Sequence, residues 1–549
     1  MHQDAAAAAT TLPPSERPLS LRRLSAIVIL GAVALVGIQL TPKEVFGDNA
    51  RKFLATEVCS LLIGLALCAW LVIDSGLSRR VRRRISVAYV LIALALVAVF
   101  RLDWKGDMEQ IAKPRRWVLN VARTIGIDVG DVAPEARTAS VALKLDPGEF
   151  DSYSFLGPTH DGKFKAAGGK LARDWTAKPP KLLWRVPVGD GWSSFVVVGD
   201  YVYTQQQTTD EAFEQVVCLN IRDGKLEWVH SDSPGHNWFL GGHGPRATPA
   251  YHDGKLYALG SAGLLNCLDA ATGKVLWSRD VVAENNAENP MWGKSSSPLI
   301  VKSKIHGDLV VVSVGGKAGR SLVAYSAADG KPVWHGGDDP SGYASPVELT
   351  LGGVRQIVIV DFQSVVGHDP ETGGVLWSYD RWSSNDPKVP QPIAIDDKRL
   401  FISAGYGVGC RMLEITKSGD AWKVDELWKS TKFKPKFMNP IVRDGYAYGL
   451  DDGEFLMCVD LNDKAEVKWR SKRGMNYGHG QILLVDDLLI VQSQEGDLAL
   501  VPARPDKFEE LSRITALPDG ISWNQPVLVG NKLLVRNDEE AACYELPTE

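Results

Sequence analysis

A recurring set of polar and aromatic residues stands directly before a series of apolar runs in the C-terminal two-thirds of the chain. If these runs are strands radiating from one centre, the side chains converge there, and Arg246, Lys294 and His479 supply positive charge. Such a cationic funnel would bind an anion or an acidic peptide through charge-assisted hydrogen bonds. The alternative is that these groups bond only to backbone and water in a central channel. The set comprises Trp192, Ser193, Arg246, Thr248, Lys294, Ser295, Tyr343, Ser345, Gln391, Asn439, His479, Gln481, Trp523, Asn524 and Gln525.

Cysteine and histidine spacing indicates no metal site. His236 and His243 share the stretch 231–244, but their spacing matches no known metal signature. Four cysteines stand two residues before a turn-opening Asn, Asp or Glu, which predicts small buried side chains too far apart for disulfides. These are Cys218, Cys267, Cys458 and Cys543. We therefore expect no metal ligand and no catalytic residue.

A repeated phrase supplies the elements that must position the axial residues. It reads DAATGKVLW at 269–277 and DPETGGVLW at 369–377, with related copies ending at Trp228 and Trp334. An Asp that closes a turn and a Gly with positive φ join two strands of a hairpin, and the Trp ends the outer strand. We expect that Trp to dock on the neighbouring hairpin, where burial of the ring stabilises by roughly 2–3 kcal/mol. The docking residues are Trp184, Trp228, Trp277, Trp334, Trp377, Trp428 and Trp469.

The spacing of the Trp residues, roughly 40 to 60, is typical of four-stranded propeller blades. The chain contains eight apolar openings but only seven Trp closures, and Leu511 is expected to replace the eighth Trp. The first closure, around Trp184, precedes every opening, so this N-terminal strand should complete the C-terminal blade and close the ring. The sequence therefore predicts an all-β, eight-bladed β-propeller over residues 151–549, with seven blades as the alternative.

The front of the chain differs from the repeat. Residues 24–40, 58–73 and 85–100 are uncharged apolar runs close to the length of a membrane-spanning helix, with buried core helices as the alternative. They predict a three-helix membrane anchor over residues 24–102, after a cytoplasmic tail (1–23) and before a linker (103–150). Arginines at 79, 80, 82, 83 and 84 place the second loop in the cytoplasm, and hence the propeller in the periplasm of a bacterial inner membrane.

The phrase Asp-x-x-Thr-Gly-Lys-x-x-Trp resembles the tryptophan-docking repeat of the quinoprotein (pyrroloquinoline quinone, PQQ) β-propeller family. The resemblance covers about residues 150–546 and extends to the outer-membrane protein assembly scaffold, an eight-bladed propeller without a cofactor. It also extends to PQQ-dependent alcohol and glucose dehydrogenases. The alcohol dehydrogenases of that family carry adjacent cysteines, and no two cysteines are adjacent here.

These observations predict a membrane-anchored, periplasmic, non-catalytic scaffold that binds a protein or peptide at the propeller face. The alternative is a PQQ-dependent sugar or alcohol dehydrogenase, with calcium, delivering electrons to membrane quinone. No cofactor is predicted from the residues themselves. The formal net charge of −5 gives no attraction to nucleic acid.

Overall fold

The chain divides into two compact units. One contains residues 1–131 with 239–241, and the other contains residues 132–238 and 242–549. The computed structural model describes residues 21–40, 49–71, 77–105, 109–114, 137–208, 213–233, 241–316, 318–382, 387–453, 455–518 and 520–549.

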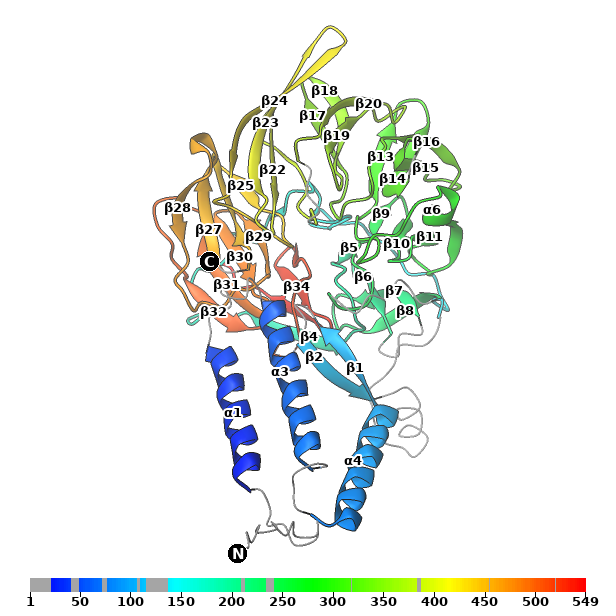
Figure 1. Cartoon of the computed structure of the whole chain (residues 1–549). Coiled ribbons are helices and arrows are strands. Elements are labelled where there is room, and N and C mark those ends of the chain that lie inside the picture. Colours follow the sequence, from blue (N-terminus) through cyan, green and yellow to red (C-terminus); the bar gives the residue numbers. More distant parts are fainter. Residues whose placement is uncertain are drawn as a thin grey trace, which may run out of the picture. The chain divides into compact units, whose positions relative to one another are not determined.

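The described residues of the first unit form the helices α1, α3 and α4 and a hairpin (Figure 1). The hairpin pairs its two strands antiparallel, with Phe100 opposite Pro114. The strands occupy the start of the stretch that the sequence predicted to be a linker. The elements are α1 (Leu21–Leu40), α3 (Asn49–Ala69), α4 (Arg79–Val99), β1 (Phe100–Lys105) and β2 (Glu109–Pro114).

Within the described ranges, none of the helices combines the length and the apolar character that crossing a membrane requires. The prediction of three membrane-spanning helices in residues 24–102 is therefore not supported. Charged residues explain the difference in part, because α4 begins with a cluster of arginines, and α3 contains Arg51, Lys52 and Glu57. The periplasmic location of the propeller stays a prediction, and the tail 1–20 lies outside the described residues.

The second unit is a ring of eight sheets arranged around one centre, antiparallel except where β3 pairs parallel with β29 (Figure 1). The sequence prediction of an eight-bladed, all-β propeller is confirmed. From β5 onward, the strands of each sheet follow chain order from the inner strand outward, because turns join consecutive strands. Gly254 shows one such turn: it adopts a φ of +75° between β9 and β10.

The first four blades run continuously along the chain. Blade 1 contains β5 (Val196–Val198), β6 (Tyr201–Gln207), β7 (Glu214–Asn220) and β8 (Leu226–Asp232). Blade 2 contains β9 (Ala250–His252), β10 (Lys255–Leu259), β11 (Leu264–Asp269) and β12 (Val275–Asp280), followed by the short helix α6 (Val281–Glu284). Blade 3 contains β13 (Leu299–Ser303), β14 (Gly307–Gly316), β15 (Arg320–Ser326) and β16 (Pro332–Gly336). Blade 4 contains β17 (Val347–Leu351), β18 (Val354–Val360), β19 (Val365–His368) and β20 (Val375–Tyr379).

The remaining blades include two strands from the N-terminal side of the ring. Blade 5 contains β21 (Ile393–Ala394), β22 (Arg399–Ala404), β23 (Gly409–Ser418) and β24 (Ala421–Ser430). Blade 6 contains β25 (Ile441–Arg443), β26 (Tyr446–Asp451), β27 (Phe455–Asp460) and β28 (Glu466–Arg470), with the 3-10 helix η2 (Leu461–Asp463) before β28. Blade 7 contains β29 (Gln481–Val485), β30 (Leu488–Gln492), β31 (Asp497–Pro502), β32 (Ser512–Thr515) and the added strand β3 (Lys163–Phe164). Blade 8 contains β33 (Val527–Val529), β34 (Lys532–Arg536), β35 (Glu540–Glu545) and β4 (Lys181–Pro187).

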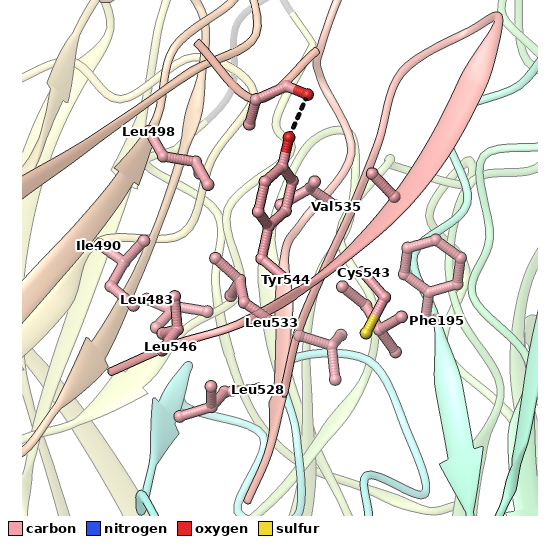
Figure 2. Close-up of a cluster of buried hydrophobic side chains, with 14 of the residues drawn as sticks. Phe195, Leu483, Ile490, Leu498, Leu528, Leu533, Val535, Cys543, Tyr544 and Leu546 are labelled. Atoms are coloured by element: carbon pink, nitrogen blue, oxygen red, sulfur yellow. Dashed lines mark hydrogen bonds between the residues drawn. The ribbon is translucent and has the colours of Figure 1, made fainter. Parts of the chain in front are cut away.

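The ring closes as the sequence predicted. Strand β4 pairs antiparallel with β35, placing Trp184 opposite Cys543, so the start of the ring supplies the outer strand of the last blade. Figure 2 shows the core at this closure, where Leu483 and Ile490 of blade 7, Leu533 of blade 8 and Phe195 of blade 1 gather. Because one apolar cluster joins these three blades, closure buries the sheet edges that an open ring would expose.

Every blade with a docking Trp in its outer strand shows the same register shift between that strand and its neighbour. The residue opposite the Trp is followed by a register shift, as between Cys267 and Leu268 where Cys267 faces Trp277. A β-bulge turns the local strand and redirects its side chain. Shifts at equivalent positions follow Cys218, Ala324, Gly367, Met412, Cys458 and Cys543.

The indoles lie across the seams between blades. Trp228 of blade 1 is fully buried, and its Nε1 donates to the Ala270 oxygen of blade 2 at 3.1 Å. A Cβ on Gly273 of that blade would come within 2.6 Å of the Trp228 ring. The glycine of the repeat therefore both permits the turn and provides the surface on which the preceding indole rests. The same arrangement joins Trp184 to Gly224, Trp277 to Gly330 and Trp334 to Gly373.

The contact between blades changes where the following blade lacks the repeated phrase. Trp377 donates to Gln356 of its own blade, and Trp428 is only half-buried. Trp469 donates to the Arg504 oxygen at 2.7 Å. Leu511 is partly buried and packs against the core at the ring closure.

The propeller unit begins before the predicted boundary at residue 151. Arg137 forms a bridge with Val229, and the amides of Ala139 and Leu143 donate to the oxygens of Thr272 and Ala271. Residues 137–150 therefore belong to the propeller unit rather than to a free linker, because they lie on blades 1 and 2.

Candidate binding site at the propeller axis

A belt of hydrogen bonds links the residues that stand two positions before successive inner strands. The Ser194 amide donates to Thr248 Oγ1 at 3.0 Å, and the Thr248 amide donates to Ser297 Oγ at 2.9 Å. The Ser297 amide donates to Ser345 Oγ at 2.8 Å. Each bond joins one blade to the next, so these hydroxyls satisfy backbone donors that a closed ring brings together.

Longer amide side chains continue the belt through blades 5 to 8. The backbone N–H of Gln391 donates to the side-chain Oδ1 of Asn439 at 2.6 Å, and Gln525 Nε2 donates to the Ile482 backbone oxygen at 2.8 Å. Ser194 Oγ closes the circuit by donating to the Gln525 oxygen at 2.5 Å. Gln391, Asn439 and Gln525 thus each take part in a hydrogen bond with an adjacent blade.

Two of the predicted cations donate to backbone oxygens. Arg246 donates to the oxygens of Gly244 and Gly242 at 3.1 and 2.9 Å, and burial lowers its pKa to about 10. Lys294 is 1% exposed, and its Nζ donates to the Val314 oxygen at 2.5 Å. Burial lowers the Lys294 pKa to about 8, whereas the charge of Asp361 opposes that shift.

Asp361 is a buried carboxyl group beside this lysine. It is fully buried at the end of β18, and neither of its oxygens has a hydrogen-bond partner within ordinary geometry. Burial raises its pKa well above the usual range, and nearby Asp339 adds to the effect. Lys294 and Asp361 are therefore both buried inside the ring, and neither is an accessible receptor for an anion.

Aromatic rings from different blades meet at the axis. Trp523 of blade 8 stacks on Trp192 of blade 1, with ring centroids 4.8 Å apart, and on Phe437 of blade 6 at 4.7 Å. The ring of His479, from blade 7, lies 5.0 Å from that of Phe437. Because these blades are not all neighbours, the rings converge near the centre. Phe437, His479 and Trp523 are half-buried there.

A lysine completes this aromatic cluster. Lys436 Nζ lies 4.6 Å from the ring centre of Tyr406 and 4.9 Å from that of Phe437. It also approaches His479 Nε2 at 3.5 Å. A cation over aromatic faces is attracted by roughly 0.5–2 kcal/mol. We define the axial cluster as Trp192, Tyr406, Lys436, Phe437, His479 and Trp523.

Lys436, Phe437 and Tyr406 were not among the residues predicted from the sequence. Phe437 stands two residues before Asn439, as Trp523 does before Gln525 and His479 before Gln481. Alignment of all eight openings in one register would have identified Phe437 and, one position earlier, Lys436. No sequence signal places Tyr406, because it follows β22 in a turn outside the repeated opening.

Two long loops, residues 231–244 and 280–293, connect an outer strand to the inner strand of the next blade, and the first of them is described in part. His236 lies outside the described residues, and His243 is half-buried. In the second loop, Asn289 Nδ2 donates to the Ser261 oxygen at 2.9 Å, and the ring of Trp292 lies 5.5 Å from that of Tyr343. Among the described residues, no group of three or more His, Cys, Asp or Glu side chains is arranged to hold a metal ion.

Comparison with known proteins finds relatives that share the propeller repeat. A family model described as outer membrane protein assembly factor BamB matches residues 230–470. This match supports a PQQ-repeat β-propeller family for the part of the chain that the model covers. It is 27% identical over 205 residues to the quinohemoprotein alcohol dehydrogenase of Comamonas testosteroni, covering 35% of this chain and 26% of that protein. It is 23% identical over 250 residues to the tetrathionate hydrolase of Acidithiobacillus ferrooxidans, covering 39% of this chain and 45% of that protein.

The chain thus spans less than half of the length of each of these relatives. The solved structure of the Comamonas testosteroni quinohemoprotein alcohol dehydrogenase matches with a TM-score of 0.50 at 14% identity, covering 73% of this chain and 81% of that one. At this identity the match shows a shared fold. Activity does not follow from fold alone.

The residues of this PQQ-repeat propeller that were expected to receive carboxylates fit the quinone poorly. PQQ is a tricarboxylate, whereas Lys294 and Arg246 already donate to carbonyl oxygens of the ring. To use them, the cofactor would have to displace those bonds and leave buried carbonyl groups unsatisfied, at about 1–3 kcal/mol each.

Proposed function

We propose that this PQQ-repeat propeller is a non-catalytic scaffold that binds a peptide segment of a partner protein over the axial cluster. The observation that carries the proposal is the meeting of half-buried rings, above all Phe437 and Trp523, beside the ammonium group of Lys436. Aromatic side chains with one polar handle are enriched where proteins recognise one another.

The chemistry of the cluster selects the peptide. Flat rings favour aromatic, proline or other apolar side chains, and Lys436 favours a neighbouring carboxylate. The match to the BamB family model supports a scaffold role. The surrounding belt supports it too, because its bonds between blades hold the cluster on a rigid frame.

A peptide-display selection tests the proposal. The immobilised full-length chain is expected to enrich peptides that pair an aromatic or proline residue with Asp or Glu. Phe437→Ala and Trp523→Ala should each lower the affinity for the selected peptides by about tenfold or more, which corresponds to about 1.4 kcal/mol of binding free energy. Ile305→Ala is the matched control, because Ile305 is an exposed aliphatic residue in the turn between β13 and β14.

Two outcomes would overturn the proposal. One is peptide enrichment that survives both substitutions in the axial cluster, and the other is equal loss in the Ile305→Ala control. The alternative function is a PQQ-dependent dehydrogenase, which the likeness to the quinohemoprotein alcohol dehydrogenase favours. It predicts turnover of sugars or alcohols once PQQ and calcium are supplied.

A further inference from the structure

A cavity of about 320 Å³ opens between blades 2 and 3, away from the axial cluster. Its walls come from β12 and α6 on one side and from β15 and β16 on the other, elements that lie close together in Figure 1. The polar side chains that line it are Arg279, Glu284, Asn285, Arg320, Tyr325 and His335. This volume is at the lower end of the range for small-molecule pockets, about 300–1,000 Å³.

Arg320 brings an unbalanced positive charge to the cavity. Its guanidinium NH1 donates to Asn285 Oδ1 at 3.1 Å. In the part of the chain that the structure describes, no Asp or Glu oxygen lies within ion-pair distance of Arg320. A guanidinium group has five N–H donors in a planar fork, so donors remain after the bond to Asn285.

Asn285, the hydrogen-bond partner of Arg320, is itself held by two hydrogen bonds. Asn285 is 6% exposed, and its Nδ2 donates to the Val281 oxygen at 2.9 Å and to the Tyr325 hydroxyl at 3.0 Å. Tyr325 is fully buried. The amide that holds the guanidinium group is therefore itself held, which reduces the entropy lost when a ligand binds.

The other charges of the cavity balance one another. Arg279 pairs with Glu284, with its NH2 3.0 Å and its Nε 3.1 Å from Oε2. His335 Nδ1 donates to the Gly319 oxygen at 2.7 Å, which leaves Nε2 as the remaining polar atom of the ring. The cavity therefore has one uncompensated positive charge, on a side chain whose geometry matches a carboxylate.

We propose that this cavity is a binding site for a small organic acid, which Arg320 holds through one carboxylate group. A single carboxylate neutralises the single free charge, whereas a phosphate dianion would leave excess negative charge beside Glu284. The apolar part of the acid would lie against Val323 and Val333, which also line the cavity. The site is independent of the proposed peptide site, because they share no residue.

Ligand-observed NMR on the full-length chain tests this inference with sodium acetate, sodium benzoate and sodium phosphate as probes. We expect benzoate to bind saturably and more tightly than acetate or phosphate. Arg320→Gln should lower the affinity for benzoate by about tenfold or more, because it removes a charge-assisted hydrogen bond. Arg399→Gln is the matched control, since Arg399 is a partly exposed arginine of blade 5 that pairs with Asp396.

A second variant keeps the test decisive if Arg320→Gln does not fold. His335→Trp places a large ring at an exposed position in the wall of the cavity and should abolish benzoate binding while the melting temperature stays near that of the wild type. The inference is overturned if no probe binds saturably up to about 10 mM. It is equally overturned if phosphate binds more tightly than benzoate, or if benzoate binds a folded His335→Trp variant as it binds the wild type.

Discussion

Replacing Gly273 with Ala tests the seam between blades 1 and 2. Gly273 has a φ of +73°, and a Cβ there would lie 2.6 and 2.7 Å from Cε3 and Cδ2 of Trp228. Ordinary carbon contacts are about 3.5–4.0 Å, so the indole must move by about 1 Å. Such a shift would also strain the bond from Trp228 Nε1 to the Ala270 oxygen.

The expected cost has three parts. The left-handed conformation costs an Ala about 1–2 kcal/mol. Overpacking against the ring adds about 1–3 kcal/mol, and a weakened buried hydrogen bond adds about 1 kcal/mol. The sum is about 3–6 kcal/mol. With an unfolding entropy near 2.1 cal/mol/K per residue, it lowers the melting temperature of a domain of about 400 residues by about 3–7 °C.

Gly254→Ala is the matched control for this substitution. Gly254 has a φ of +75°, and a Cβ there meets nothing within 4 Å. It should cost only the conformational part, about 1–2 kcal/mol or about 1–2 °C. Thermal unfolding followed by circular dichroism compares the two variants. Equal melting temperatures would refute the role of Gly273 as the surface on which Trp228 rests.

Two further substitutions and one thiol-labelling experiment test the structure of the ring. Arg536→Met should destabilise the chain by about 2–4 kcal/mol in thermal unfolding, because buried Arg536 donates to Thr204 Oγ1 at 2.7 Å and to the Gln205 oxygen at 2.8 Å across the closure; a shift no larger than that of Arg399→Gln would contradict this. Lys294 has a pKa of about 8 in the folded chain against its ordinary 10.5, so the unfolded chain binds more protons between these pH values. The free energy of unfolding should therefore rise from pH 8 to pH 10. A urea midpoint of the wild type that falls over this range, relative to that of Lys294→Met, would refute this. The thiols of Cys218, Cys267, Cys410, Cys458 and Cys543 are buried, and burial raises the pKa of each, so iodoacetamide at pH 8 should label them only after denaturation; rapid labelling of the native chain, read by mass spectrometry, would contradict their placement.

The fold was largely predictable because the repeat encodes its own mechanics. Asp269 and Gly273 specify the turn and Trp277 the seam, so the blade number and the closing role of Trp184 could be inferred from spacing. The sequence did not reveal that Gly273 faces Trp228 of the preceding blade, because that contact joins residues of different copies. The prediction that the three apolar runs are membrane spans is not supported by the described helices, and α3 and α4 extend beyond the apolar runs over charged residues.

The candidate site was less predictable. The residue type and its position before an inner strand did not separate Lys294, which donates to the Val314 oxygen, from Lys436, which lies over two aromatic rings. The cavity holding Arg320 could not be anticipated, because its residues are drawn from two blades and share no motif.

The most direct test of the scaffold account is to add PQQ and calcium to the purified full-length chain. Absorbance, melting temperature and dye reduction with alcohols and sugars are then recorded together. The account predicts no bound chromophore, an unchanged melting temperature and no dye reduction. A bound quinone spectrum accompanied by substrate-dependent dye reduction would contradict it.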